Sequence, residues 1–417
     1  MNILVIHNSY QQPGGEDVVV AQETSLLQQH GHRVTTYKRS NHEINSLSFA
    51  EKTRLLGRIV SADDSKLAVR TILRDFKPDV VHVHNTFLMV SPSVYEACHE
   101  ENVPVVQTLH NYRLLCPAAT LFREGKLCED CLTHTLLHSI GHACYRDSYA
   151  MSAATALMLT IHRVRQTWNR GVAAYIALSH FVRNKYAQSG IPPSRVYVKP
   201  NFVDPDPGER VRPGDYALYV GRLSPEKGVS TLVEAWRRVP RDVPLVIAGQ
   251  GPLRQELEAV VEKERLHNVR FVGRLDRSQV YDAMKNAAFL IVPSIWNEPF
   301  GLIIAEAFAC GTPVLAACVG AIPEMLEDGV SGLHFAPNDP EALAVKVTWA
   351  WAHLRRLAAM GKAARHAYEE RYTGNTNYRL LMNIYGSAID SHFGCTRRTP
   401  RVLETIDRLR RPLQQTA

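Results

Sequence analysis

Short apolar runs alternate with amphipathic stretches of helical length along most of the chain, and this alternation limits the fold more than any other feature. In the first half, the runs lie at residues 2–7, 33–37, 79–83, 103–108 and 172–178. Such runs match strands buried on both faces, and strand–helix alternation is typical of a parallel sheet covered by helices on both sides. The first half therefore predicts an open α/β domain.

The same alternation starts again after a break. Its second series of runs lies at residues 217–221, 244–249, 269–273, 288–293 and 313–317. Residues 201–215 separate the two series and are rich in proline, glycine and charge, which is the composition of a linker. A chain of 417 residues also exceeds what one hydrophobic core usually supports. The sequence therefore predicts two α/β domains that face each other across a cleft, where ligands of such sheets bind.

The linker and the periodicity of the chain give the expected boundaries. We place the first domain at residues 1–203, with an insertion at about 116–144, and the second at residues 204–375. Residues 376–392 are expected to form a helix that returns to the first domain. Residues 393–417 are expected to form a basic tail, because they are arginine-rich and lack a clear apolar face.

The net charge of +7 favours a negatively charged partner: nucleic acid, an anionic membrane surface or a phosphorylated substrate. Nucleic acid is the weakest of these, because the sequence contains no helix-turn-helix, zinc-finger repeat or aromatic-rich binding sheet. The opening MNILVIHNSY predicts a first strand rather than a signal peptide. No apolar run approaches the roughly 18 to 20 residues of a membrane helix, so we expect a cytoplasmic protein.

The segment PSIWNEPFGLIIAE follows a predicted strand and opens a predicted helix near Phe300 or Gly301. Free N–H groups at a helix start bind anions, and two carboxylates, Glu298 and Glu306, stand beside them. A carboxylate can accept hydrogen bonds from two vicinal hydroxyls. The segment therefore favours an anionic ligand with hydroxyls, such as a sugar nucleotide. The alternative is a helix-capping Glu298 and a surface Glu306.

Two further segments follow predicted strands. GRLSPEKG carries Arg222 and Lys227, and two fixed cations there could neutralise a departing diphosphate, as a divalent ion does elsewhere. A solvated turn is the alternative. In PGGEDVV, the adjacent Gly14 and Gly15 would let the backbone approach a phosphate at a helix start, although a plain tight turn explains them equally well.

These motifs, the E-x₇-E spacing of Glu298 and Glu306, and QTLHNYRLLCP at 107–117 together resemble the retaining GT-B glycosyltransferases of glycosyltransferase family 4. The resemblance extends to about residue 390 and is greatest to bacterial members that build exopolysaccharide, capsule or lipopolysaccharide O-chains. It implies transfer of a hexose-type sugar from a nucleotide-diphosphate sugar to a hydroxyl acceptor such as a lipid-linked glycan. It also implies an acceptor-side first domain and a nucleotide-sugar-binding second domain.

The resemblance implies roles for individual residues. Arg222 and Lys227 would bind the diphosphate, together with the backbone of Gly15 and the amides near Gly301 and Leu302. Retention without an evident carboxylate nucleophile favours attack by the acceptor on the same face of the sugar, with no catalytic metal required.

The remaining roles concern the sugars. Glu298 would hold hydroxyls of the transferred sugar, and Glu306 would hold the ribose. His110 matches the histidine near the anomeric carbon, and a histidine satisfied within the core is the alternative. Asn201 stands where the family reads Pro-Asn-Gly, with Phe202 in place of the glycine. Two other functions stay open: a nucleotide-sugar epimerase of the same fold, and a non-catalytic nucleotide-sugar-binding protein.

Four cysteines, Cys116, Cys128, Cys131 and Cys144, have the spacing C-x₁₁-C-x₂-C-x₁₂-C. This spacing is compatible with a tetrahedral structural Zn²⁺. Reduced cysteines without metal explain it equally well. A redox role is less favoured, because the C-x₂-C pair does not open a helix after a strand.

Residues 138–170 mix apolar and basic residues at helical spacing. They could lie on a membrane surface that carries the acceptor, with Arg163, Arg165 and Arg170 against anionic headgroups. The protein would then be peripheral to the inner face of the membrane. A core helix with a basic outer face is the favoured alternative.

Overall fold

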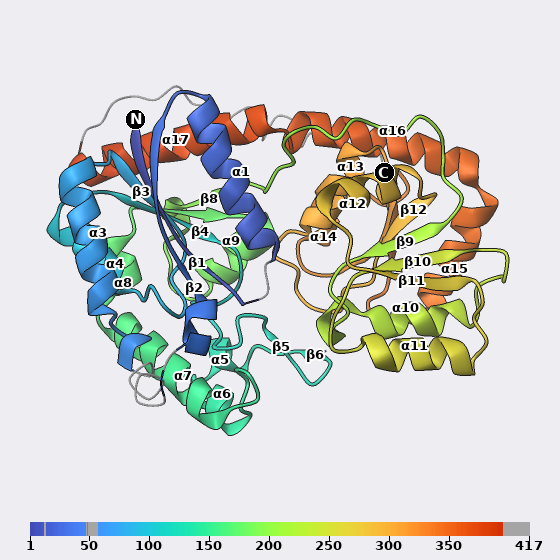
Figure 1. The fold of residues 1–417 in the computed structure, drawn as a ribbon, viewed down its shortest axis with the longest axis horizontal. Coiled ribbons are helices and arrows are strands. Elements are labelled where there is room, and N and C mark those ends of the chain that lie inside the picture. The colour runs from blue at the N-terminus through green and yellow to red at the C-terminus, as the bar shows by residue number, and fades with distance from the viewer. Residues whose placement is uncertain (12–13, 47, 49–56, 395–417) are drawn as a thin grey trace, which may run out of the picture.

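The computed structural model describes residues 1–11, 14–46, 48 and 57–394. Two six-stranded sheets lie in two lobes, side by side (Figure 1). All neighbouring strands within each of these sheets run parallel. The predicted fold class, two α/β units with parallel sheets, is therefore confirmed. Beyond residue 394, the predicted basic tail lies outside the described residues.

The first sheet has the strand order β2-β1-β3-β4-β7-β8. Its strands are β1 (Asn2–Ser9), β2 (Arg33–Ser40), β3 (Val80–Asn85), β4 (Val105–Leu109), β7 (Ala174–Ala177) and β8 (Val196–Val198). The inner strands β3, β4 and β7 are buried along their whole length, as strands covered on both faces should be. The chain forms β2 on one side of β1 and β3 on the other, so the strand order reverses between β1 and β3.

The second sheet has the order β11-β10-β9-β12-β13-β14. Its strands are β9 (Ala217–Val220), β10 (Leu245–Ala248), β11 (Val269–Gly273), β12 (Phe289–Val292), β13 (Val314–Ala317) and β14 (Gly332–Phe335). Here the order reverses between β9 and β12. In open parallel sheets, ligands bind beyond the carboxyl ends of the strands at such a reversal.

Helices cover both sheets (Figure 1). Those of the first lobe are α1 (Gly15–Gln29), η1 (Asn41–Ser46), α3 (Asp63–Phe76), α4 (Ser93–Glu100), α5 (Asp130–Thr133), α6 (Leu137–Gly141), α7 (Tyr149–Val164), α8 (Thr167–Gly171), α9 (His180–Ala187) and η2 (Pro193–Arg195). The helices that follow residue 204 in the sequence are η3 (Pro225–Lys227), α10 (Val229–Trp236), α11 (Arg254–Lys263), α12 (Arg277–Lys285), α13 (Leu302–Ala309), α14 (Ile322–Met325), α15 (Pro340–Ala352), α16 (Leu354–Arg371) and α17 (Gly374–Phe393).

The last helix, α17, lies along the first lobe, although the chain reaches it from the second (Figure 1). Leu381, Tyr385 and Ala388 of α17 are buried in one apolar cluster with Ile3 and Val106 of the first sheet. Because removing apolar surface from water is the main force for packing, this contact fixes α17 to the sheet. The helix completes the core of the first lobe.

The chain crosses between the lobes twice, and the two crossings are bonded to each other. Val203 pairs with Thr373 in an isolated parallel bridge, and the Val203 N–H donates to the Tyr372 carbonyl over 2.9 Å. We propose to keep residues 1–203 and 204–375 as the two domains, with α17 as the segment that returns to the first.

The cysteine-containing segment lies between β4 and β7. It contains an antiparallel hairpin of β5 (Phe122–Arg123) and β6 (Lys126–Leu127), followed by the short helices α5 and α6. The next helix, α7, buries Ala156, Met158 and Leu159. Across the ranges that the structure describes, no helix combines the length and the apolar character needed to cross a membrane.

Candidate functional site

The predicted motifs follow the strands at which each sheet reverses its order. The glycines after β1 open α1, GRLSPEKG follows β9, and PSIWNEPFG follows β12. His110 directly follows β4. All four segments therefore stand at the carboxyl ends of parallel strands, where a ligand of this fold is expected to bind.

Contacts between the lobes bring these segments together. The Tyr112 hydroxyl of the first lobe donates to the Asn297 carbonyl of the second over 2.9 Å. At the start of α1, a Cβ added to Gly15 would lie 3.6 Å from Cδ2 of Leu302 at the start of α13. We call this region the interlobe site, and define it as residues 110–112, 221–228 and 293–302 with the start of α1.

The two motif loops of the second lobe are fixed against each other at Gly228. This residue has a φ of +66°, and an added Cβ would lie 1.9 Å from the Pro293 carbonyl oxygen, so only glycine allows the close approach. The Ile295 N–H also donates to the Glu226 carbonyl over 3.0 Å. This packing sets Lys227 opposite Glu298.

Lys227 and Glu298 form an ion pair, with 2.5 Å between Nζ and Oε1. Ser294 Oγ donates to the same oxygen over 2.8 Å, and Glu298 is buried. Burial favours the neutral acid, but the attraction and hydrogen bond of Lys227, together with the bond from Ser294, hold the pKa of Glu298 below its usual value. Glu298 is therefore an ionised acceptor at neutral pH.

The other predicted phosphate ligands differ in exposure. The Arg222 side chain is exposed, while its carbonyl accepts a hydrogen bond from the Tyr219 hydroxyl over 2.8 Å. Gly301 caps the start of α13 with a φ of +90°, which agrees with the predicted helix start, and Leu302 is the first helical residue. Free amides of α13 therefore begin beside the Lys227–Glu298 pair.

Glu306 lies further along α13 and is half-buried. Burial raises the pKa of Glu306 to about 7, against the opposing attraction of Arg277. Within the described part of the chain, no residue hydrogen-bonds to this carboxyl group. Its oxygens are thus available to the hydroxyls of a ligand.

His110 is partly exposed at the interlobe site, and its Nε2 lies 2.9 Å from Nδ1 of His84 on β3. Burial, with nearby histidines and Lys199, holds the pKa of both imidazoles well below the usual value. Both rings are therefore neutral at pH 7. The sequence leaves a core histidine as the alternative for His110. That description fits the buried His84, whereas His110 is partly exposed at the site.

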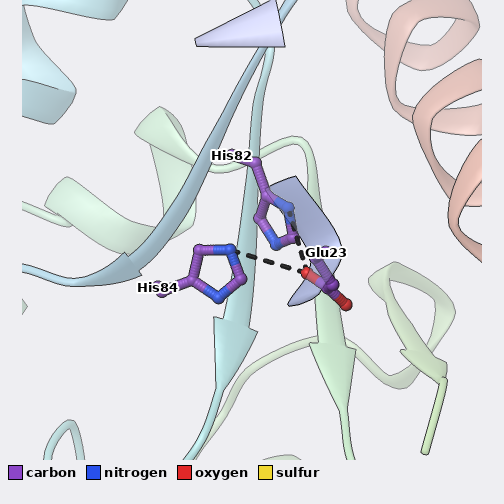
Figure 2. A group of neighbouring side chains, drawn as sticks. All are labelled: Glu23, His82 and His84. Carbon is purple, nitrogen blue, oxygen red and sulfur yellow. Dashed lines mark ion pairs between the residues drawn. The ribbon is translucent and has the colours of Figure 1, made fainter. Parts of the chain in front are cut away.

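His84 belongs to a buried group of three side chains: Glu23 from α1, and His82 and His84 from β3 (Figure 2). Among the residues described, this is the one group of three or more His, Cys, Asp and Glu whose ligand atoms all lie within 4.8 Å of one another. However, the buried ammonium group of Lys199 already pairs with Glu23. A second cation there would be repelled at low dielectric, so we interpret the cluster as an ion pair with two histidines rather than a metal site.

Sequence reasoning included Glu16, which directly follows the two glycines, in a motif but assigned it no role. Asn111 Nδ2 donates to Glu16 Oε2 over 3.3 Å, and Glu16 Oε1 lies 3.9 Å from Nδ1 of the buried His7. Burial and the neighbouring Asp17 raise the pKa of Glu16 to about 8. A carboxyl group in a motif already singled out for its glycines was the available signal.

Asn201 lies in the connection after β8 rather than on a motif loop. Its side chain is buried, and its Oδ1 has no hydrogen-bond partner among the described atoms. A buried oxygen without a partner is costly, so a donor from a ligand would satisfy it. The backbone nevertheless keeps the following Phe202 fully buried in place of the family's glycine.

The four predicted zinc ligands all lie in the segment between β4 and β7. A hydrogen bond from Cys131 lowers the pKa of the Cys116 thiol, and Cys128 and Cys144 lie within electrostatic range of Cys131. Cys116 and Cys131 are buried, and the other two are half-buried. The sulfur atoms do not form one of the compact ligand groups found among the described residues.

Comparison with known proteins identifies the family. Residues 13–207 match the family described as Glycosyltransferase Family 4, and residues 207–367 match the one described as Glycosyl transferases group 1. The chain is 30% identical over 313 residues to glycogen synthase of Mycobacterium tuberculosis, which covers 74% of this chain and 67% of that protein. The chain is a family 4 glycosyltransferase.

Other relatives of this family 4 glycosyltransferase match shorter parts of it or its fold. D-rhamnosyltransferase WbpZ of Pseudomonas aeruginosa is 30% identical over 160 residues, 38% of this chain and 42% of that protein. The crystal structure of Anabaena Alr3699/HepE in complex with UDP-glucose matches with a TM-score of 0.66 and 20% identity, over 93% of this chain and 100% of that chain. At this identity the likeness supports the GT-B fold, and the predicted family and enzyme class are confirmed by the sequence matches.

Proposed function

We propose that this glycosyltransferase moves a hexose-type sugar from a UDP-sugar to a hydroxyl of a lipid-linked glycan, with retention of anomeric configuration. The observation that carries the proposal is the Lys227–Glu298 pair, which places a cation and an ionised hydroxyl acceptor beside the free amides of α13. The choice of base follows the UDP-glucose present in the HepE structure.

The proposed binding mode uses the geometry of the interlobe site. Lys227, Arg222 and the amides at Gly301 and Leu302 would share the diphosphate, because cations and helix starts both bind phosphate oxygens. The exposed backbone at Gly14 and Gly15 would approach the same group from the first lobe.

The sugar ligands come from the carboxylates. Glu298 would hold hydroxyls of the transferred sugar, Glu306 the ribose, and His110 would face the anomeric carbon. Asn201 would contribute its unpaired oxygen from the connection after β8.

The proposed reaction depends on charge. As the bond from the anomeric carbon to the phosphate oxygen breaks, negative charge grows on the diphosphate, and fixed cations with helix-start amides stabilise it. These groups supply the charge that a divalent ion supplies in other transferases, so we propose catalysis without a metal cofactor. The acceptor hydroxyl attacks the face that the diphosphate leaves and transfers its proton to the departing phosphate.

A donor panel tests the function. The purified chain is incubated with UDP-, GDP- and ADP-sugars, with and without an extract of lipid-linked glycans as acceptor. Products are identified by mass spectrometry. We expect release of UDP from a UDP-sugar, slow with water and faster with acceptor. An isomerised sugar nucleotide from donor alone would identify an epimerase, and bound donor without turnover would identify a binding protein.

We propose that the enzyme works in the cytoplasm at the inner face of the membrane, where a lipid-linked acceptor would be presented. On α7 and just beyond it, exposed Leu157 and Val164 stand near basic Arg165 and support this orientation. Arg163, in contrast, donates to the Leu114 carbonyl over 2.9 Å and is used within the lobe. The buried face of α7 supports the core-helix interpretation at the same time.

We also propose a structural zinc ion at Cys116, Cys128, Cys131 and Cys144, supported by their spacing and their common segment. Protein purified without added zinc is expected to contain about one equivalent, and chelation is expected to lower its melting temperature. Cys128→Ser should lose the metal, whereas Cys318→Ser, an exposed cysteine of the second lobe, should keep it. Zinc well below one equivalent, with an unchanged melting curve after chelation, contradicts the proposal.

A further inference from the structure

A chain of buried polar groups leads from His110 away from the interlobe site. His110 Nε2 lies 2.9 Å from His84 Nδ1, and His84 Nε2 lies 3.6 Å from Glu23 Oε2. The other Glu23 oxygen pairs with Lys199, which also donates to Asn377 of α17 over 3.3 Å. Glu23, His84 and Lys199 are each at most 4% exposed, so they are shielded from bulk solvent.

The order of this chain determines which nitrogens carry protons. A neutral imidazole has one N–H donor and one lone-pair acceptor. Glu23 Oε2 can only accept, and Figure 2 shows both His84 and His82 directed at it. His84 Nε2 and Glu23 Oε2 are both buried, and neither has a hydrogen-bond partner among the described residues. A lone pair on His84 Nε2 would therefore leave two buried acceptors facing each other 3.6 Å apart, an arrangement that low dielectric penalises. This contact favours a proton on His84 Nε2, which leaves Nδ1 as the acceptor toward His110.

We propose that Glu23 is a positioning residue that fixes the tautomers of His84 and His110. With His84 Nδ1 as the acceptor, His110 must donate from Nε2, which leaves a lone pair on His110 Nδ1. No residue within the described ranges hydrogen-bonds to that nitrogen. His110 therefore presents an acceptor, and not an N–H donor, to a ligand.

This assignment selects between two chemistries for His110. A lone pair accepts a hydrogen bond from a sugar hydroxyl and is attracted to positive charge that develops at an anomeric carbon, whereas an N–H group does neither. The consequence for the sugar rests on the proposed function, but the tautomer itself does not depend on any ligand. The role of Glu23 is indirect, because it acts through His84.

Charged neighbours support neutral rings. Lys199 already compensates Glu23, so an additional proton on His84 would place a second cation in the same buried cluster. Burial lowers the pKa of His84, which is lowered further by the nearby His82, His110, His7 and Lys199. Each imidazole in this chain of buried polar groups therefore carries one proton. The Glu23 carboxylate determines which ring nitrogen carries it.

The direct test is ¹H–¹⁵N spectroscopy of the full chain with ¹⁵N-labelled histidine, in which protonated and lone-pair ring nitrogens are distinguished. Signals are assigned with His84→Gln and His110→Gln. We expect both rings to be protonated on Nε2 in the unaltered protein without any ligand. An Nδ1 proton on either ring overturns the proposal.

A double variant tests the cause. Glu23→Gln with Lys199→Met removes the carboxylate and its compensating charge together, and an amide can donate to His84 Nε2. We expect His110 to acquire a proton on Nδ1 and kcat with UDP-glucose to fall at least tenfold, while Glu258→Gln on α11 changes neither. Unchanged tautomers in the double variant contradict the role of Glu23, and if this variant does not fold, the spectrum of the unaltered protein decides. The expected tautomers in a protein that consumes no nucleotide sugar would leave this inference intact and remove the proposed function.

Discussion

Lys227→Met is expected to reduce kcat for sugar transfer by about 10²- to 10³-fold, the range for loss of one group that stabilises developing charge in an active site. Lys227 stands 2.5 Å from Glu298 and beside the start of α13, where the departing diphosphate would gain charge. The KM for the donor should rise less than kcat falls, because this stabilisation is strongest in the transition state. Steady-state release of UDP from a UDP-sugar measures both constants.

The stability of this variant needs its own control. Removing Lys227 leaves the buried Glu298 without its cation, and because Lys227 is 28% exposed we expect a loss of about 3 kcal/mol or less in unfolding free energy. Lys227→Met combined with Glu298→Gln removes both charges, so it should recover stability but not turnover. Turnover close to that of the unaltered protein in Lys227→Met would remove this residue from the site.

Glu306→Gln is expected to weaken donor binding by about 10²-fold, because a ribose would lose hydrogen bonds to a charged acceptor, each contributing about 1.5–3 kcal/mol.

Without a ligand, the same substitution should make the folded protein more stable. The pKa of Glu306 in the folded protein is about 7, above the ordinary value of 4.5. Below pH 4.5 the group is neutral in both states and costs nothing; the cost grows between about pH 4.5 and pH 7 and levels off above pH 7. At pH 8 the variant should therefore be more stable than the unaltered protein by at most about 3 kcal/mol.

The same carboxyl group links donor binding to pH. Hydroxyls of a ribose donate to the ionised form, so affinity of the unaltered protein for a UDP-sugar should increase from pH 6 to pH 8, with release of a proton on binding near pH 7. Glu306→Gln should show a flat profile for this component. Calorimetry in buffers of different ionisation enthalpy measures the released proton, and a proton release that persists in the variant would assign it to another group.

The sequence predicted most of the sheet framework because its strands are strongly apolar runs. It missed the two edge strands β8 and β14. Strand β8 has only three residues, and β14 contains Gly332 and His334, so neither forms a long continuous apolar run. The start of α13 was predicted within a residue, since Gly301 and the apolar helix after it are a local signal.

The site was only partly predictable, because sequence patterns report local features and not contacts between distant residues. Motifs identified Lys227 and Glu298, but their ion pair joins residues 71 positions apart and depends on the close approach at Gly228. Glu23 and Lys199 lie in ordinary helix and strand-end contexts, and their pairing across 176 positions appears in no local pattern. Long-range partners of buried charges follow from the tertiary structure and not from spacing.

The paired crossings at Val203 and Thr373 also restrict how this enzyme can open. We expect these two bonded crossings to act as a hinge, about which the lobes would swing rather than slide. Because α17 is anchored on the first lobe beyond that hinge, a swing widens the gap at the opposite edge first. Admission of a nucleotide sugar and departure of its product would then share one aperture, whose width the hinge sets.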